Sequence, residues 1–367
     1  MRILITTDTI GGVWTFTREL TIGLLDAGCE VVLVSIGPLP NVQQQRWADD
    51  MQRHWGSHFQ FIADNVPLEW MQANESAYSQ PARFLLQSIE ELQVDVLHCN
   101  QFCFGALPTE RPKVITTHSD VLSWAASCRA EELDDSDGLR RYRSLVGNGL
   151  AGAQAVVAPT RWMLEALGES FDLPENRRVI ASGRSIPATS QNFRKLQAIT
   201  AGRLWDEAKN VGLLREVSSP MPLLIAGDIS CDGANAPSAL GAVGLLGRLA
   251  EDDLLTMFRK SELYICTSRY EPFGLAPLEA ALCGCAVLAN DIPSLREVWR
   301  DGALYFHDAA SLSELLRKVH GDRDLLARAK AHSSIQAHAY TREKMTISYL
   351  ALFQQVLARH REVAYVA

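Results

Sequence analysis

Short, almost continuous apolar runs recur along this chain, and each is followed by a segment with helical spacing or by a loop. "RILIT" at residues 2–6 is followed by a helical pattern over 13–27 and then by "EVVLVSI" at 30–36. Strands that are buried on both faces read as continuous apolar runs, and their alternation with helices is typical of a parallel sheet covered by helices. The alternation therefore predicts an α/β fold with parallel sheets.

The apolar runs form two series. The first continues through "DVLHC", "KVITT" and "AVVAP" to "RRVIAS"; the second comprises "LQAITAG", "MPLLIAGD", "GAVGLLG", "ELYICT", "AVLAND" and "ALYFHD". Between them, "GRSIPATSQNFRK" over 183–195 is rich in small and turn-forming residues and is the expected linker. The 367 residues also exceed the size at which one core usually stops growing. We predict two doubly wound Rossmann-like domains, 1–185 and 186–340, that face each other across a deep cleft.

Two segments stand apart from this pattern. Residues 341–362 have apolar positions at helical spacing, and a helix over 341–367 is expected to rejoin the first domain. Residues 38–80 are polar and irregular, so no element is predicted there with defined bounds.

Composition and charge exclude several classes of protein. Hydrophobic residues make up 47% and charged residues 21% of the chain, which is typical of a soluble globular enzyme. The net charge of -8 argues against a dedicated nucleic-acid binder, which needs a basic surface. No run approaches the roughly 18 apolar residues of a membrane span, and the N-terminus does not read as a signal peptide. We expect a cytoplasmic protein with at most peripheral contact at the inner face of the membrane.

The eight cysteines are scattered through apolar segments, as expected of reduced, buried thiols. Their close spacings, "CNQFC" and "CGC", lack a second pair at the distance of a zinc site. We expect no metal and no cofactor.

"GRLWDEAKN" places two cations, Arg203 and Lys209, after the end of an apolar strand. Arginine offers a planar fork for phosphate oxygens, and lysine a compact mobile charge. Because doubly wound sheets bind ligands outside the carboxyl ends of their strands, the pair predicts a diphosphate clamp. The alternative is two solvated charges, one of them paired with Asp206 or Glu207.

"EPFGLAPLEA" reads as a loop followed by a helix that begins near Leu275, since Pro277 is tolerated only in a first turn. The backbone N–H groups at such a helix start form a ready anion or hydroxyl site. Three residues supply them here: Phe273, Gly274 and Leu275.

Two carboxylates, Glu271 and Glu279, flank this helix start. Glu271 is expected to accept hydrogen bonds from sugar hydroxyls, and Glu279 from a ribose diol. The alternatives are an ordinary loop acid for Glu271, and for Glu279 a helix-dipole stabilisation of about 0.3–1 kcal/mol.

"GRLWDEAKN" and "EPFGLAPLEA" together resemble the paired signatures of the retaining glycosyltransferases of family 4, which have the GT-B fold. The second stretch matches the family's pattern of two glutamates separated by seven residues. "RILITTDTIGGVWTFTREL" resembles the family's first strand and glycine loop. The resemblance covers the whole chain; it is strongest over 199–300 and weakest over 38–95 and 183–195.

The resemblance implies a metal-independent hexosyltransferase. It would move a sugar with retention from a nucleotide-diphosphate sugar, UDP slightly preferred over GDP, to a hydroxyl acceptor in glycan, polysaccharide or glycolipid synthesis. Arg203 and Lys209 would hold the diphosphate, Glu279 the ribose, and Glu271 the transferred sugar beside the backbone amides named above. Fixed cations and amides that face a departing diphosphate lower the barrier. No carboxylate of the N-terminal half is placed as a nucleophile, so we expect front-face substitution with the leaving phosphate as base.

Further candidates lie at other strand ends. Gly11 and Gly12 open the first helix and let the backbone approach a ligand closely, unless they form a plain turn. The resemblance implies that His118, after "KVITT", lines the donor-sugar pocket; His98, after "DVL", is a weaker candidate. Loops at Gly247 and Arg248 are expected to contribute donor-binding walls.

Two features depart from the family pattern or stand outside it. The family commonly has an Asn-Gly pair and a nearby acid after the last strand of the first domain, whereas this chain has "VIASGRSIPA". A basic cluster, Arg140, Arg141 and Arg143, faces either an anionic acceptor or membrane surface, or solvent.

Alternatives from other classes stay open at this point. A nicotinamide-dependent oxidoreductase would suit doubly wound domains, although no G-x-G-x-x-G follows a strand. A non-catalytic, two-lobed ligand-binding protein is a second alternative, and a phosphorylase-like or epimerase-like GT-B enzyme a third.

Overall fold

The computed structural model of the chain describes residues 1–65, 68–71, 76–129, 133–187, 193–231, 234–235 and 243–366. It divides into two compact units. Unit 1 comprises Met1–Ala125, Glu131–Gly183 and Arg342–Ala367, and unit 2 comprises Ala126–Ala130 and Arg184–Thr341. The chain therefore passes from unit 1 to unit 2 after Gly183 and returns at Arg342. Parts of two predicted segments, 188–192 of the linker and 241–242 of "GAVGLLG", lie outside the described residues.

Unit 1 contains a seven-stranded sheet in the order β3-β2-β1-β4-β5-β6-β7, and its strands pair in parallel. The strands are β1 Arg2–Thr7, β2 Glu30–Ile36, β3 Phe59–Asp64, β4 Val96–Cys99, β5 Lys113–Thr116, β6 Ala155–Ala158 and β7 Arg177–Val179. The order reverses between β1 and β4, and the carboxyl ends of these two strands therefore form the switch point at which doubly wound sheets bind ligands.

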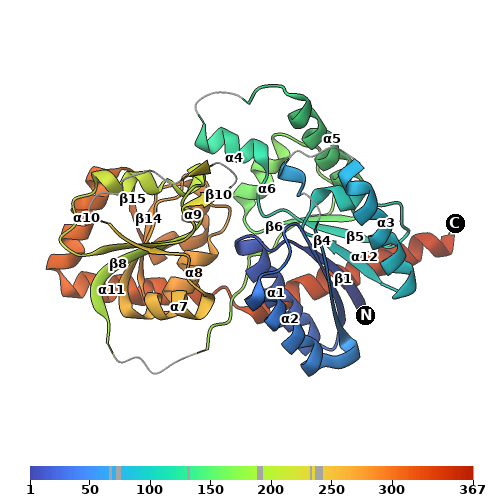
Figure 1. The fold of residues 1–367 in the computed structure, drawn as a ribbon, viewed down its shortest axis with the longest axis horizontal. Coiled ribbons are helices and arrows are strands. Elements are labelled where there is room, and N and C mark those ends of the chain that lie inside the picture. Colours follow the sequence, from blue (N-terminus) through green and yellow to red (C-terminus); the bar gives the residue numbers. More distant parts are fainter. Residues whose placement is uncertain are drawn as a thin grey trace. The chain divides into compact units, whose positions relative to one another are not determined.

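Helices surround this sheet (Figure 1). They are α1 Gly12–Asp26, α2 Val42–Trp55, α3 Ser76–Glu91, α4 Val121–Cys128, α5 Asp137–Gly152, α6 Arg161–Gly168 and α12 Arg342–Val366, with the 3-10 turns η1 Gly56–His58, η2 Glu69–Met71 and η3 Phe102–Ala106. Every residue of β4, β5 and β6 is buried, because helices cover both faces of the sheet.

The C-terminal helix α12 packs against α1 within unit 1. Arg342 Nε donates a hydrogen bond to Glu19 Oε2 at 2.6 Å. A Cβ atom on Gly23 would lie 1.9 Å from Thr346 Oγ1, so a glycine is needed where the two helices meet. Tyr349 and Phe353 of α12 are fully buried.

The polar segment 38–80 contains two elements that the sequence did not define, α2 and β3. Asn41 begins α2 with a capping box, in which its side chain accepts from Gln44 N and the Gln44 side chain accepts from Asn41 N. Strand β3 lies at the edge of the sheet and is only partly buried, which explains its weak apolar pattern.

Unit 2 contains a six-stranded sheet in the order β12-β9-β8-β13-β14-β15, and all its pairs are parallel. The strands are β8 Lys195–Ala201, β9 Leu223–Ala226, β12 Gly244–Gly247, β13 Ser261–Cys266, β14 Ala286–Asn290 and β15 Ala303–Phe306; β10 Ser230–Cys231 and β11 Ala234–Asn235 form a separate antiparallel pair. Here the switch point lies between β8 and β13. Both units thus have the predicted doubly wound topology.

The helices of unit 2 alternate with these strands, as predicted. They are α7 Glu251–Lys260, α8 Leu275–Leu282, α9 Pro293–Trp299, α10 Ala309–Gly321 and α11 Arg323–Ala337, with the 3-10 turns η4 Glu207–Lys209, η5 Val211–Glu216 and η6 Arg300–Gly302. The core between sheet and helices is aliphatic, with Leu263, Leu288 and Leu316 among its buried members.

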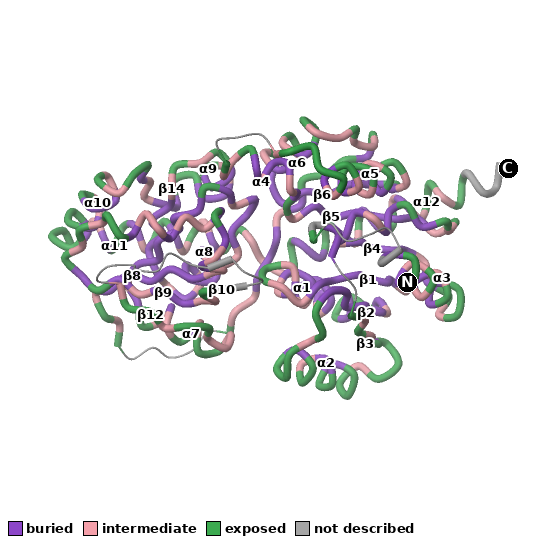
Figure 2. The backbone as a smooth tube through the Cα atoms, turned by 45° about the horizontal axis from the view of Figure 1, so that its top comes forward, coloured by how far each residue is buried: buried purple, intermediate pink, exposed green. Residues whose placement is uncertain are grey.

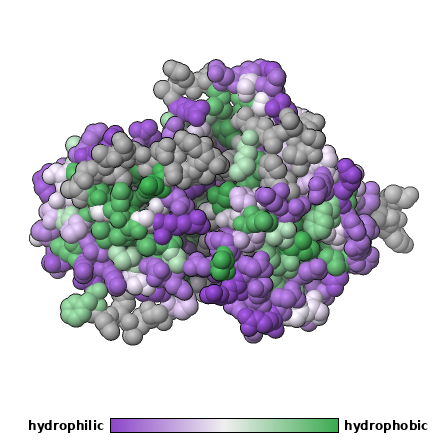
Figure 3. All heavy atoms as spheres, in the orientation of Figure 1, coloured by the Kyte–Doolittle hydropathy of each residue, from purple (hydrophilic) through white to green (hydrophobic). Residues whose placement is uncertain are grey.

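Central strands such as β4 and β14 are coloured mainly as buried in Figure 2, whereas α2 and α10 have exposed sides. Hydrophilic and hydrophobic side chains are interspersed over the visible face in Figure 3. Within the part of the chain that the structure describes, no helix is both long enough and apolar enough to cross a membrane.

Candidate active site

The loops that follow β8 and β13 are bound to each other at the switch point of unit 2. Thr267 Oγ1 donates to Lys209 O at 2.6 Å, and Arg269 N donates to Ala208 O at 2.8 Å. Within the two strands themselves, the Tyr264 hydroxyl of β13 donates to the backbone oxygen of Ala201, the last residue of β8, at 3.2 Å. These bonds fix the backbone of both loops, so the side chains they carry are held close together.

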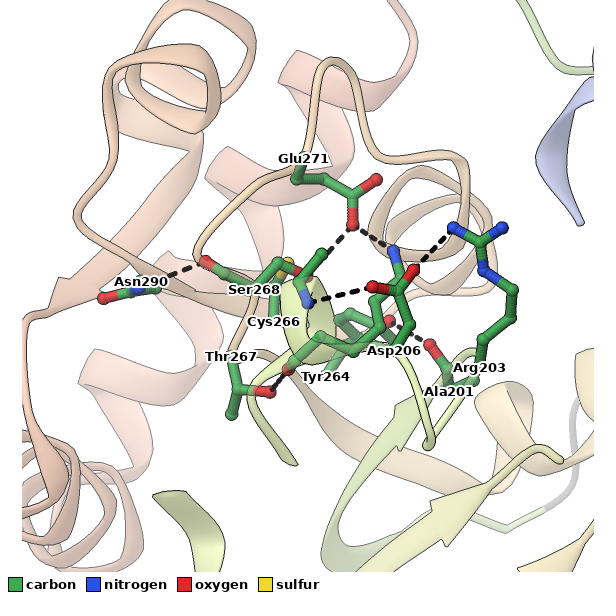
Figure 4. Close-up of polar contacts among 11 residues, drawn as sticks. Ala201, Arg203, Asp206, Tyr264, Cys266, Thr267, Ser268, Glu271 and Asn290 are labelled. Atoms are coloured by element: carbon green, nitrogen blue, oxygen red, sulfur yellow. Dashed lines mark hydrogen bonds and ion pairs between the residues drawn. The ribbon is translucent and has the colours of Figure 1, made fainter. Parts of the chain in front are cut away.

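The side chains of Lys209 and Glu271 are hydrogen-bonded at this point. Figure 4 labels Glu271 and draws the contacts of its carboxylate as dashed lines. Lys209 Nζ lies 2.5 Å from Glu271 Oε2, and Ser268 Oγ donates to the same oxygen at 3.0 Å. Asn290 Nδ2 in turn donates to Ser268 O at 3.1 Å. The side chains of Lys209 and Glu271 are 21% and 14% exposed, so this pair is reachable from solvent yet largely enclosed.

Arg203 lies beside this pair with its guanidinium 2.7 Å from Asp206 Oδ2 (Figure 4). Its Cζ lies 5.5 Å from the centroid of the Trp205 ring. Asp206 also accepts from Ala208 N at 2.9 Å, which fixes its carboxylate. Arg203 is therefore paired with Asp206, as the alternative interpretation of the sequence allowed. Its side chain is still 40% exposed.

Helix α8 begins at Leu275, as predicted. Gly274 precedes it with φ +92°, in the left-handed region that favours glycine. A Cβ on Gly274 would lie 2.9 Å from Pro277 Cγ and 3.3 Å from Glu271 Cγ. The ring of Phe273 packs edge-on against Tyr340, with centroids 5.3 Å apart. The first-turn N–H groups have no acceptor inside the helix, so their direction is set by this tight turn next to Glu271.

Glu279 lies on α8 and is 8% exposed. Arg184 Nε donates to Glu279 Oε1 at 2.8 Å, and the other arm of the same guanidinium is paired with Glu251. The backbone N–H of Arg184 donates to the backbone oxygen of Tyr340 at 3.1 Å. Arg184 was not predicted from the sequence as a site residue. Its one signal was a lone arginine in the otherwise small and apolar stretch "VIASGRSIPA", where the family pattern already failed.

Gly247 ends β12 and Arg248 follows it, next to the ends of β9 and β8. Gly227 N donates to Gly247 O at 2.8 Å, and a Cβ on Gly227 would lie 1.8 Å from Gly202 O. The three strand ends are thus held together by glycine backbone. Arg248 is exposed, with Nη1 3.6 Å from Asp228 Oδ2.

In unit 1, Gly11 ends the turn between β1 and α1, and Gly12 is the first residue of α1. Gly11 is the N-cap with φ +64°, and a Cβ there would meet nothing within 4 Å. Trp14, near the start of α1, is 6% exposed and packs edge-on against Trp47 with ring centroids 5.4 Å apart. It belongs to the core.

His118 follows β5 and is partly buried; its Nε2 lies 2.7 Å from Asn100 Oδ1. Burial lowers the pKa of His118 to about 3. His98 is fully buried, with Nε2 2.8 Å from Thr116 Oγ1. Burial, and to a lesser degree the neighbouring His118, lowers the pKa of His98 to about 3. His98 is therefore a core residue, whereas His118 stays a candidate for ligand contact.

The arginine cluster of α5 is not uniform. Arg140 Nη1 lies 2.9 Å from Asp135 Oδ2, and the same guanidinium is paired with Asp137. Arg143 lines a pocket of about 570 Å³ that also includes Phe171 and Asp172. Part of the cluster's charge is therefore neutralised locally, and the solvent-facing interpretation holds for Arg140.

Two doubly wound parallel sheets are the architecture of the GT-B glycosyltransferases. A family model described as "Glycosyltransferase Family 4" matches residues 10–185, and one described as "Glycosyl transferases group 1" matches residues 213–334. The chain belongs to the group 1 glycosyltransferases of family 4. The predicted fold and family are both confirmed.

Individual relatives agree with this assignment. The chain is 32% identical over 119 residues to the serotype-specific mannosyltransferase WbdA of Escherichia coli. The aligned region is 32% of this chain and 15% of that protein. The fold matches sucrose-phosphate synthase from Thermosynechococcus elongatus with a TM-score of 0.77 at 16% identity, over 98% of this chain and 100% of that one. It also matches Anabaena Alr3699/HepE, solved with UDP and glucose, with a TM-score of 0.70 at 16% identity, over 96% and 99% of the two chains.

Proposed function

We propose that the protein transfers a sugar, with retention of configuration, from a nucleotide-diphosphate sugar to a hydroxyl acceptor. The observation that carries the proposal is the Lys209–Glu271 pair, held at 2.5 Å at the switch point of unit 2. This is the place where a doubly wound sheet presents its ligand. A cation there suits a diphosphate, and a carboxylate beside it suits sugar hydroxyls.

The proposed roles rest on the charges of unit 2 and on the family resemblance. Arg203 and Lys209 bind the diphosphate, and their fixed charge stabilises the negative charge that develops as the sugar departs. Glu271 accepts from hydroxyls of the transferred sugar, with the amides of Phe273, Gly274 and Leu275 beside it. Glu279 accepts from the nucleotide ribose, and Gly247 and Arg248 contribute to the donor wall. In unit 1, Gly11, Gly12 and His118 are the candidates for contact with the substrate.

The transfer proceeds on one face of the sugar. The acceptor oxygen forms its bond to the anomeric carbon while the bond from that carbon to the phosphate oxygen breaks, and the acceptor proton passes to the leaving phosphate. This sequence uses no metal and no cofactor. UDP is the preferred nucleotide, and the solved relative that contains UDP and glucose supports that preference. The acceptor is a sugar, a lipid or a small molecule in glycan, polysaccharide or glycolipid synthesis.

The test is a panel of UDP- and GDP-sugars with hydroxyl acceptors, in the presence and absence of EDTA. We expect release of the nucleoside diphosphate together with a glycoside whose anomeric configuration, read by NMR, matches the donor. Arg203→Ala and Glu271→Ala should cut turnover severely and leave the circular dichroism spectrum unchanged. Near-normal transfer in both variants would contradict the site, and an inverted product would contradict retention.

A further inference from the structure

Asn100 lies directly after β4, at the switch point of unit 1, and its polar groups link three segments. Its backbone N–H donates to Thr6 Oγ1 at 3.1 Å. Its side-chain Nδ2 donates to Thr6 O at 2.7 Å and to Thr17 Oγ1 at 3.1 Å. Its Oδ1 lies 2.7 Å from His118 Nε2. Asn100 therefore connects the end of β1, helix α1 and the loop after β5.

The orientation of the Asn100 amide follows from this network. The Thr6 carbonyl oxygen can only accept a hydrogen bond, so the group that faces it must be the amino group of Asn100. The amide oxygen then faces His118. Because that oxygen also only accepts, the proton of the short contact must be carried by His118 Nε2.

A neutral imidazole with its proton on Nε2 has an unprotonated Nδ1. The neutral form is favoured because burial lowers the pKa of His118 to about 3. The titratable neighbour, His98, is held neutral in the same way. The Phe16 ring packs edge-on against the His118 ring, with centroids 4.6 Å apart, and fixes the plane of the imidazole.

We propose that Asn100 is a positioning residue that fixes His118 as the neutral tautomer protonated on Nε2, so that Nδ1 is presented as a hydrogen-bond acceptor to a hydroxyl group of the substrate. A lone pair at Nδ1 binds a hydroxyl and repels a phosphate oxygen. The site therefore discriminates between the sugar and the diphosphate of one donor. The tautomer itself does not depend on the proposed function; only the identity of the hydroxyl donor rests on it.

The tautomer can be read directly in the full, substrate-free protein. Long-range ¹⁵N–¹H correlation spectra of the histidine rings report which nitrogen carries the proton, and the His118→Gln variant assigns the signal. We expect a protonated Nε2 and an unprotonated Nδ1 at pH 7. A protonated Nδ1, a mixture of the two tautomers, or an imidazolium at pH 7 would each overturn the proposal.

Asn100→Asp tests the positioning role, with Asn148→Asp on the exposed face of α5 as a control of identical chemistry. The new carboxylate at position 100 stabilises the imidazolium, so the pKa of His118 should rise. We expect the imidazolium signal and the acidic fall of kcat/KM for the donor both to appear at higher pH than in wild type. The Asn148→Asp protein should match wild type. An unchanged His118 titration in a folded Asn100→Asp protein contradicts the proposal.

The two proposals fail in different ways. If the spectra show the expected tautomer but no donor in the panel supports transfer, then the proposed function is wrong and the role of Asn100 in fixing the ring stands. If transfer occurs but His118 carries its proton on Nδ1, then the role of Asn100 is wrong and the proposed function stands.

Discussion

The switch points of the two units have the same strand topology but differ in the side chains that they hold. Each lies where the strand order reverses between the first and fourth strands of its sheet. In unit 2 this place holds the ion pairs Lys209–Glu271 and Arg203–Asp206. In unit 1, Asn100 after β4 is uncharged and is hydrogen-bonded to threonines and to a histidine whose pKa burial lowers to about 3. Asp8 after β1 accepts from Ile10 N at 2.8 Å.

The difference separates what topology decides from what the loops decide. Parallel strands bring the residues after their carboxyl ends to one edge, whatever those residues are. The loops then supply charge in unit 2, which suits a diphosphate, and neutral donors and acceptors in unit 1, which suit hydroxyl groups. Perturbing each switch point should therefore give effects of different size and different pH dependence.

The largest effect is expected where unit 2 buries charge. Arg184→Met removes the guanidinium, of which 4% is exposed, from Glu279 and Glu251. Breaking a buried ion pair by removing one partner costs about 3–5 kcal/mol, and the lower end is expected because the Glu251 side chain is 38% exposed. Denaturant unfolding measures the loss. Arg53→Met, which breaks a pair on the surface of α2 with Arg53 76% exposed, should change stability by less than about 1 kcal/mol. Equal effects in the two variants would remove the distinction.

Next in size is the loss of the Lys209 charge, which we propose stabilises the departing diphosphate. Lys209→Met should lower kcat/KM by about 10²–10³, the range found when one group that stabilises transition-state charge is removed. Lys209→Arg should recover part of it. Lys318→Met, at an exposed pair with Glu314 on α10, is the matched control and should keep wild-type kinetics. Full activity in Lys209→Met with an intact fold would place the charge-stabilising group elsewhere.

Acid should weaken unit 1 through its histidines. The pKa of His98 is lowered to about 3 in the folded protein from an ordinary value of 6.5, so its contribution to stability is present above pH 6.5 and is lost as the pH falls toward 3. The slope is about 1.4 kcal/mol for each pH unit below 6.5. His98→Gln should remove this slope, measured as the difference in unfolding free energy between pH 7 and pH 5. Glu69 and Asp120, whose pKa values burial raises, act in the opposite direction and cancel in the comparison with wild type. Parallel pH curves for the two proteins would refute the assignment.

The smallest effect is expected for the loss of one uncharged, hydrogen-bonded hydroxyl group of unit 1. Thr17 Oγ1 is buried and lies 3.0 Å from Thr7 Oγ1 and 3.1 Å from Asn100 Nδ2. Thr17→Val keeps the shape of the side chain and should cost about 1–2 kcal/mol in urea unfolding, because the partners are uncharged. A loss as large as that of Arg184→Met would erase the contrast between the units.

The sequence predicted the parts of this molecule that local pattern controls. Strand β2 has the predicted bounds Glu30–Ile36, and α8 begins at the predicted Leu275. The proximity of Lys209 and Glu271, 62 positions apart, followed from their places after two strands of one parallel sheet. Their roles in transfer stay predictions.

The sequence could not predict side-chain contacts that leave no trace in the hydrophobic periodicity. Arg184 and Glu279 are 95 positions apart, and Arg184 lies in a linker without apolar spacing. The links from Asn100 to Thr6, Thr17 and His118 depend on side-chain directions, which strand assignment alone does not give. Strand β3 escaped detection because an edge strand buries only part of its surface.

Helix α12 gives the chain an order of assembly. Unit 1 includes Arg342–Ala367 as well as the segments before Gly183, so the ribosome makes helix α12 only after the whole of unit 2 has been synthesised. Until then Gly23 of α1 lacks its neighbour Thr346, and the apolar groove that receives Tyr349 and Phe353 stands open to water. Domains generally fold in the order of their synthesis. In this protein all of unit 2 is synthesised before unit 1 is complete, and unit 1 can reach its final fold only after α12 has been made.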